Sequence, residues 1–378
     1  MTEETELIEQ GGVRRSLPPA DHAARRKQVR VALDASGAGM LLVTDPVNVR
    51  YLSGFTGSSG QLLIATEEGA DRLVTDDRYT ARAALEAPEL PVVRSRDAAG
   101  VALVAAGAVP LAVEADHLTW AAAERLRERA QETGTHIVPT TGLVASLRAV
   151  KDATEIALLA RACSITQDAL EWLFVEVVAA GRTERELARR LERRFVDEGA
   201  DGVAFPSIVA GGPNSAAPHH EPTGRPLAPG DLLTVDCGAL VAGYHADHTR
   251  TVAIGHLDDR LREVHALVVR AQAAGREAAV AGASGGDVDA AARDVIEDAG
   301  YGERFVHGTG HGVGLAIHEA PAVAKGSRAR LEAGMALTVE PGVYLPGTGG
   351  IRIEDTIVVT ADGPAWTLTD TPRELRVL

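Results

Sequence analysis

Four carboxylates in the C-terminal part of the chain have the residue type and the placement of metal ligands. Asp236 ends an apolar run, Asp247 precedes a second one, and a glycine-rich turn joins the two runs. In a later pair of apolar runs, Glu340 ends the first, and Glu354 lies inside the second, which we expect to be one strand over residues 351–359. A charged side chain at the end of a buried strand is costly to desolvate unless a cation accompanies it. The mirrored pairs therefore predict a bound cation.

The segment between the two acidic pairs is rich in glycine and histidine. It reads His307-Gly-Thr-Gly-His-Gly-Val-Gly-Leu-Ala-Ile-His318. Alternating glycines disfavour a helix, so His307 and His311 are not the HExxH pair of a zincin, whose glutamate is also missing. The segment is not a dinucleotide-binding fingerprint either, because Val313 stands where the third glycine is required. We expect the glycines to let backbone approach the site closely while the histidines project into it.

These acids and His311 together form a donor set dominated by hard oxygen. Four ionised carboxylates would balance two divalent cations, and the set favours Mn²⁺, Co²⁺ or Fe²⁺ over a thiolate zinc site. Two such ions that share a water lower its pKa and make hydroxide available near neutral pH. Each residue taken alone is more often a turn, salt-bridge or structural residue. The repetition of the pattern in two hairpins is what favours a dinuclear metal site.

The composition limits the remaining classes of function. The chain has 378 residues, 45% apolar and 24% charged, with a net charge of −15. This composition is typical of a globular protein. The negative net charge disfavours binding to nucleic acid or to an anionic membrane. Cys163 and Cys237 form no CxxC pair, and the acidic start has no apolar signal region. We therefore expect a cytoplasmic protein.

The elements that position these residues fall into two parts. Strands expected at 40–44, 62–65, 72–75, 111–114 and 136–139 alternate with helices that begin near Asp21 and Thr119, which predicts an α/β domain over residues 1–145. A turn is expected at Asp45-Pro46. Residues 146–378 read as helices from Asp152 and Thr183, a hairpin, helices at 258–281 and 287–299, and a second hairpin. That order favours a duplicated α+β unit.

Several of these stretches resemble a known family. Residues 236–247, 307–314, 338–344 and 351–355 resemble the pita-bread metallopeptidases, which include methionine aminopeptidase, aminopeptidase P and prolidase. Residues 48–57 and 75–79 are similar to the additional creatinase/prolidase-like domain of the proline-directed branch. The resemblance implies an α+β fold, with a pita-bread catalytic domain at 146–378 and an N-terminal α/β domain at 1–145.

The resemblance also implies a role for each matched residue. Two divalent ions, with manganese favoured over cobalt, iron or zinc, would be bound by Asp236, Asp247, His311, Glu340 and Glu354. Asp247 and Glu354 would bridge the ions, and Glu340 would also take a proton from the attacking water.

The remaining matched residues face the substrate in that family. His219 and His318 would contact the substrate and stabilise the tetrahedral intermediate. His307 would line the proline pocket, and Arg352 would orient carboxylates near the metals. His220 is an extra neighbour of His219 that we expect to be solvated.

The function that the resemblance implies is a dinuclear Xaa-Pro aminopeptidase, which uses metal-activated hydroxide to cleave the bond between an N-terminal residue and proline. The 50–57 stretch places aminopeptidase P ahead of the alternative, an Xaa-Pro dipeptidase (prolidase). Two further alternatives are a metal-free amidinohydrolase that resembles creatinase and an inactive binding protein of the same fold. The expected partners are Xaa-Pro peptides or dipeptides and a second copy in a homodimer, with neither nucleic acid nor membrane.

Overall fold

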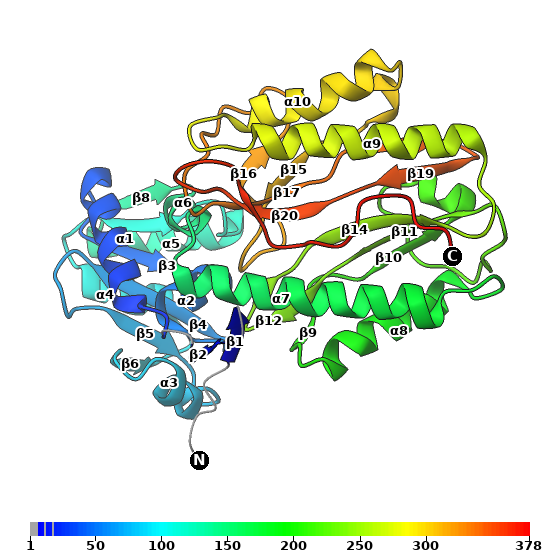
Figure 1. Ribbon diagram of the computed structural model, residues 1–378. Helices are drawn as coiled ribbons and strands as arrows, with labels where there is room; N and C mark the ends of the chain where they lie inside the picture. The colour runs from blue at the N-terminus through cyan, green and yellow to red at the C-terminus, as the bar shows by residue number, and fades with distance from the viewer. Residues whose placement is uncertain (1–6, 11–12, 17–18) are drawn as a thin grey trace. The chain divides into compact units, whose positions relative to one another are not determined.

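The computed structural model describes residues 7–10, 13–16 and 19–378 (Figure 1). Residues 19–148 form one compact unit, and residues 149–378 form the body of another. The antiparallel strands β1 (Leu7–Gln10) and β2 (Val13–Ser16) group with the second unit. Among the described residues, no helix has both the length and the apolar character needed to cross a bilayer.

The unit 19–148 is built on a mixed six-stranded sheet in the order β6-β5-β4-β3-β7-β8. Its strands are β3 (Met40–Val43), β4 (Gly60–Ala65), β5 (Arg72–Thr75), β6 (Val92–Arg94), β7 (Leu111–Glu114) and β8 (Ile137–Thr140). β3 pairs antiparallel with β4 and parallel with β7. The expected strands of this domain are therefore confirmed, and the 62–65 and 72–75 segments pair as an antiparallel hairpin.

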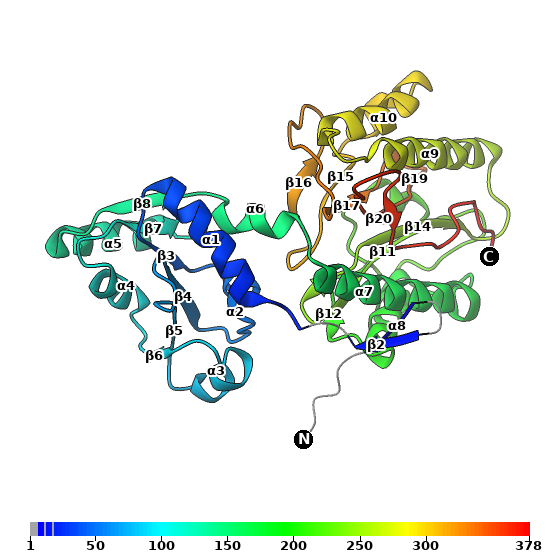
Figure 2. The same cartoon turned by 60° about the vertical axis from the view of Figure 1, so that its left-hand side comes forward.

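Helices cover the sheet of this unit (Figure 2). They are α1 (His22–Ser36), α2 (Pro46–Ser53), α3 (Thr80–Glu86), α4 (Ala98–Ala106) and α5 (Trp120–Thr133), and a further helix, α6 (Leu143–Ala149), follows β8. Side chains alternate across a strand, so Leu42 and Leu63 share one face, where they pack with Ala102 and Leu126 of α4 and α5. The expected turn at residues 45–46 is instead the start of α2, with Asp45 as its N-cap.

The first half of the second unit begins with two helices. They are α7 (Ala153–Trp172), which continues as a π-helical turn (Leu173–Val177), and α8 (Glu184–Asp197). The helix expected from Asp152 is confirmed, and Asp152 and Glu155 form a capping box at its start. The strands that follow are β9 (Gly202–Val203), β10 (Ile208–Gly211), β11 (Leu232–Cys237), β12 (Ala239–Val241), β13 (Tyr244–His245) and β14 (His248–Ala253), with a 3₁₀ turn at Gly212–Ala216.

The second half again starts with two helices, α9 (Asp259–Ala278) and α10 (Gly285–Asp298). After a 3₁₀ turn (Gly302–Arg304) come β15 (Gly310–Gly312), β16 (Glu319–Val323), β17 (Ala336–Val339), β18 (Gly342–Leu345), β19 (Gly349–Arg352), β20 (Asp355–Val358) and β21 (Trp366–Thr367). The single strand expected over 351–359 is interrupted, so Glu354 lies between β19 and β20 rather than inside a strand.

The two halves repeat the same order of elements. Each places three antiparallel strands after its helix pair, β10-β11-β14 in the first half and β15-β17-β20 in the second. In both views α9 and α10 lie on one side of the central strands, and α7 lies on the other (Figure 1, Figure 2). This order agrees with the duplicated α+β unit that the sequence predicts.

Candidate metal centre

The predicted site residues converge on one cavity of about 530 Å³ in the second unit. Those that line it are Asp236, Asp247, His311, Glu340, His219, His307, His318 and Arg352. Glu354 lies behind this surface, with 1% of its area exposed. The structure thus brings together residues that are spread over more than a hundred positions of the sequence.

The predicted metal donors lie within coordination reach of one another. Asp247, His311 and Glu354 each offer one ligand atom, and these atoms lie within 4.8 Å of one another. His311 Nε2 is 3.5 Å from Asp247 Oδ2 and also 3.5 Å from Glu340 Oε1. One ion placed between these atoms would contact ligands from both halves of the unit.

The ring of His311 is oriented for metal binding. Its Nδ1–H donates to the carbonyl oxygen of Gly312 at 3.0 Å, which leaves the lone pair of Nε2 directed at the carboxylates. Burial lowers the pKa of this imidazole to about 4, so the ring is neutral at physiological pH. A neutral imidazole with a fixed tautomer is the form that binds a metal ion.

Two glycines beside His311 allow other strands to approach. A Cβ on Gly310 would lie 2.0 Å from the carbonyl oxygen of Thr338, and a Cβ on Gly312 would lie 2.0 Å from that of Ala320. Neither position therefore tolerates a side chain. The expectation that glycines permit close backbone approach at this segment is confirmed.

The carboxylates are held in an environment that disfavours their charge. Burial, followed by repulsion from the neighbouring carboxylates, raises the pKa values of Asp247 and Glu354. Burial also raises the pKa of Glu340 to about 8, although Arg352 opposes it. Among the described residues, Asp236 Oδ1 and Glu354 Oε1 are buried without a hydrogen-bond partner. Oxygen atoms of this kind are what a divalent cation requires, so the residues present fit such an ion.

Arg352 links acids from the two halves. Its Nη2 donates to Asp236 Oδ2 at 2.7 Å, and its Nε donates to Thr249 Oγ1 at 3.2 Å. Thr249 in turn donates to Glu354 Oε2 at 2.7 Å. One oxygen of each acid is therefore held by a protein donor, while its other oxygen stays available to an ion.

Tyr344 is a site residue that the sequence analysis did not single out. Its hydroxyl accepts from Arg352 Nη1 at 2.9 Å and lies 2.8 Å from His307 Nε2. Since His307 Nδ1–H donates to the carbonyl oxygen of Gly308 at 2.7 Å, Nε2 is the acceptor and the tyrosine hydroxyl donates to it. The signal available in the sequence was its position in the 338–344 stretch.

The histidines on the substrate side differ in exposure. His219 and His318 are exposed at the cavity, and the His318 ring lies edge-on to His311 with centroids 4.3 Å apart. The expectation that His220 is solvated is wrong. Its Nε2 lies 2.9 Å from Oε2 of Glu184, which is fully buried at the start of α8.

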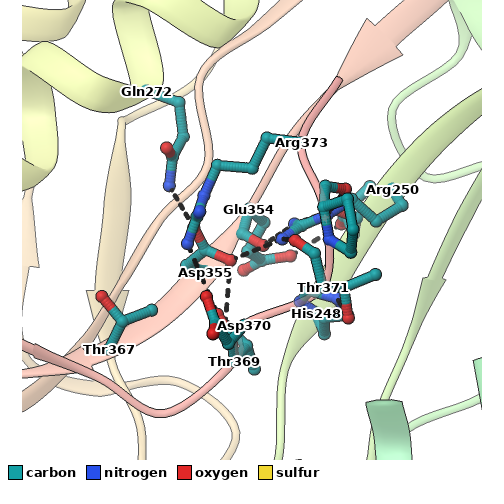
Figure 3. Close-up of polar contacts among 12 residues, drawn as sticks. His248, Arg250, Gln272, Glu354, Asp355, Thr367, Thr369, Asp370, Thr371 and Arg373 are labelled. Carbon is teal, nitrogen blue, oxygen red and sulfur yellow. Dashed lines mark hydrogen bonds and ion pairs between the residues drawn. The ribbon is translucent and has the colours of Figure 1, made fainter. Parts of the chain in front are cut away.

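A second buried acid was also missed. Asp355 accepts hydrogen bonds from Arg250, Gln272, Thr369 and Arg373 at 2.6 to 3.0 Å (Figure 3). Burial raises its pKa, but Arg250 and its other cationic neighbours outweigh that effect and lower the pKa to about 2. This network attaches the C-terminal segment and α9 to the strand that begins directly after Glu354.

Comparison with known proteins agrees with this site. The family model described as metallopeptidase family M24 matches residues 157–361, and the model described as creatinase/prolidase N-terminal domain matches residues 25–150. A protein named Xaa-Pro dipeptidase from Pyrococcus furiosus is 34% identical over 343 residues, which cover 91% of this chain and 97% of that protein.

Solved structures share the whole architecture. The structure of an Xaa-Pro dipeptidase from Bacillus anthracis superposes with a TM-score of 0.89 at 37% identity, covering 95% of this chain and all of that one. An X-Pro aminopeptidase from Thermotoga maritima gives a TM-score of 0.86 at 34% identity, covering 93% and 99% of the two chains. Both comparisons span the two units.

Proposed function

The chain belongs to metallopeptidase family M24 and is a metallo-exopeptidase of pita-bread fold, and from this premise we propose that it is a dinuclear Xaa-Pro dipeptidase. In this proposal residues 146–378 carry the reaction, and residues 1–145 form a separate domain. The observation that carries the proposal is the single cavity at which buried, partly unpartnered carboxylates from both halves meet exposed histidines.

The ions of this proposal are two divalent cations. They would be held by Asp236, Asp247, His311, Glu340 and Glu354, with Asp247 and Glu354 as the bridging pair. The excess of carboxylate oxygen over nitrogen supports manganese. When bound, the ions supply Lewis-acid polarisation of the scissile carbonyl and a lowered pKa for the attacking water.

The remaining groups move protons and orient the substrate. Glu340 faces the cavity beside His311 and accepts the proton that the attacking water loses. His219 and His318, exposed at the cavity, donate hydrogen bonds to the substrate carbonyl oxygen as negative charge develops on it. His307 is fixed by Tyr344 and Gly308, which suits a rigid wall for the proline ring.

The dipeptidase assignment replaces the aminopeptidase preferred from the sequence. That preference rests on the 50–57 stretch, and Tyr51, Leu52, Ser53 and Phe55 are buried in the N-terminal unit. Buried residues of this kind stabilise their own domain and carry no information about the length of a substrate. Relatives with the dipeptidase name, among them the P. furiosus protein and the B. anthracis structure, support the alternative.

A paired peptide assay tests the proposal. The purified protein is loaded with Mn²⁺, and kcat/KM is measured for Gly-Pro and for an Xaa-Pro-Pro tripeptide. We expect the dipeptide to be preferred by about tenfold or more, because in a dipeptidase the residues beyond proline would find no contacts of their own. Preference for the tripeptide would restore the aminopeptidase, and no hydrolysis of either peptide would favour an inactive binding protein.

A further inference from the structure

Glu184 is a buried acid outside the predicted metal site. It is the first residue of α8, and none of its side-chain area is exposed. An acid at this place of a helix usually caps the backbone N–H groups of its own first turn. Here Thr183 performs that role by accepting from the Glu186 N–H, so the Glu184 carboxylate is free to serve another segment.

That segment is the loop of residues 211–223, which carries His219. Glu184 Oε1 accepts from the backbone N–H of Gly211 at 2.8 Å and from Asn214 Nδ2 at 2.9 Å. Glu184 Oε2 accepts from His220 Nε2 at 2.9 Å and from Thr223, through its N–H at 2.9 Å and its hydroxyl at 2.6 Å. A single carboxylate thus joins the beginning and the end of the loop.

The loop faces the cavity between these attachments. Residues 218–222 line the cavity, and His219 is exposed there while its neighbour His220 is turned toward Glu184. On the opposite side, Arg352 Nη1 donates to the carbonyl oxygen of Pro218 at 3.4 Å. The position of His219 is therefore set by two groups, by Glu184 at the two ends of the loop and by Arg352 at Pro218, directly before His219.

The donors around Glu184 explain how the charge is tolerated. Burial raises the pKa of Glu184, but the hydrogen bonds from Gly211, Thr223, His220 and Asn214 outweigh it and lower the pKa to about 2. The carboxylate therefore stays ionised, and an ionised acceptor makes stronger hydrogen bonds than a neutral one. A glutamine here would present N–H donors to groups that are themselves donors.

We propose that Glu184 is a positioning residue that fixes the substrate-side loop and, through it, the ring of His219. This inference rests on the proposed function, because it gives His219 a contact with the Xaa-Pro substrate. Displacing a reacting or orienting group by about 1 Å costs about a hundredfold in rate. Release of the loop from Glu184 therefore impairs the reaction without touching a predicted metal ligand.

A double-mutant cycle with Glu184→Gln and His219→Ala tests the proposal, using the metal-loaded protein and the Xaa-Pro dipeptide. We expect Glu184→Gln alone to lower kcat/KM by about ten- to hundredfold, and to change it by less than about twofold when His219 is already alanine. Metal content per chain should stay at the wild-type value. A purely structural role would lower the folded fraction and give the same factor in both backgrounds, which would overturn the proposal.

Two further variants serve as a control and as a substitute in this experiment. The control is Glu186→Gln, which removes the same charge from the same helix. In the described contacts the Glu186 carboxylate pairs only with Arg182 and Arg190. This variant should therefore change kcat/KM by less than about twofold. If Glu184→Gln does not fold, Thr223→Val removes one donor from the same carboxylate and takes its place in the cycle, with an expected loss of about threefold. An inactive wild-type protein would refute the proposed function instead, so the two failures are distinct.

Discussion

The two halves of the catalytic unit have the same order of elements but contribute different chemistry. The first half supplies Asp236 and Asp247 from the strand pair β11 and β14, with no histidine among the predicted metal ligands. The second half supplies Glu340 and Glu354 at the matching ends of β17 and β20, and adds His311 from β15. Duplication of a hairpin thus explains the four carboxylates, whereas the imidazole belongs to one half alone.

Each half also holds its histidine-bearing segment with a buried acid on its second helix. In the first half this acid is Glu184. In the second it is Asp289 of α10, which accepts from the N–H of Thr309 at 3.0 Å and from its hydroxyl at 2.8 Å. Arg293 binds Asp289 and donates to the carbonyl oxygen of His307 at 2.7 Å.

The anchored segments differ in where they lead. The segment held by Glu184 carries His219, which is exposed at the cavity, while the segment held by Asp289 leads to His311, which lies among the carboxylates. Under the proposed function, the same device would serve substrate contact in one half and metal binding in the other. Variants of the two halves should separate these consequences.

The largest effect is expected from His311→Ala. Loss of the imidazole removes the nitrogen ligand and leaves repelling carboxylates, so metal affinity and kcat should each fall by about a hundredfold or more. Elemental analysis and the dipeptide assay measure the two quantities. His256→Ala, at an exposed position, is the control. A wild-type metal content in His311→Ala would remove this residue from the metal site.

Asp289→Asn should weaken metal binding by about tenfold, because the backbone before His311 loses a charged acceptor. Asp294→Asn, on the exposed side of the same helix, should bind metal as the wild type does. Titration of the metal-depleted proteins with Mn²⁺ gives the Kd values. The proposed difference between the two halves would be wrong if Asp289→Asn left the Kd for Mn²⁺ unchanged while Glu184→Gln raised it.

Arg352→Lys tests the connection between the halves. A lysine ammonium lacks the planar fork whose two nitrogens donate separately to Asp236 and Tyr344, so it cannot reproduce this geometry and we expect kcat/KM to fall by about tenfold. The effect should be seen with the dipeptide at saturating Mn²⁺. Full activity of this variant would show that the link between the halves is dispensable.

The smallest effect concerns stability at acid pH. The folded-state pKa of Glu184, about 2, lies below its unfolded value, so its ionised form stabilises the fold at pH above about 4.5. That contribution should decline as the pH falls from about 4.5 to 2. Urea unfolding of wild type and Glu184→Gln should therefore give a stability difference that shrinks over this interval. A stability difference that does not change with pH would contradict the hydrogen bonding of an ionised Glu184 in the folded protein.

The residues that gather at the cavity were predictable because their signals are local. An acid at the end of an apolar run, repeated in two hairpins, marks Asp236, Asp247 and Glu340 without any knowledge of the fold. The interruption at Glu354 was not predictable, because residues 351–359 read as one apolar strand. The two parts of this segment pair with different strands: β19 pairs with β18, and β20 pairs with β17.

The supporting acids could not be found in the same way. Glu184 reads as an ordinary first-turn acid of a helix, and its partner Thr223 lies 39 residues away. In the sequence, Asp355 is only the neighbour of the predicted ligand Glu354, and its hydrogen-bond partner Gln272 lies 83 residues away. Their role depends on tertiary contacts that a local pattern does not encode.

The central claim, that both halves hold one pair of divalent ions, is tested most directly by metal counting. Wild type, Asp247→Ala from the first half and Glu354→Ala from the second half are loaded with Mn²⁺, dialysed and analysed for metal per chain. We expect about two ions in the wild type and at most about one in each variant, because in the proposed site both acids would bridge the ions. Retention of two ions in either variant, or one ion in the wild type, would contradict the claim.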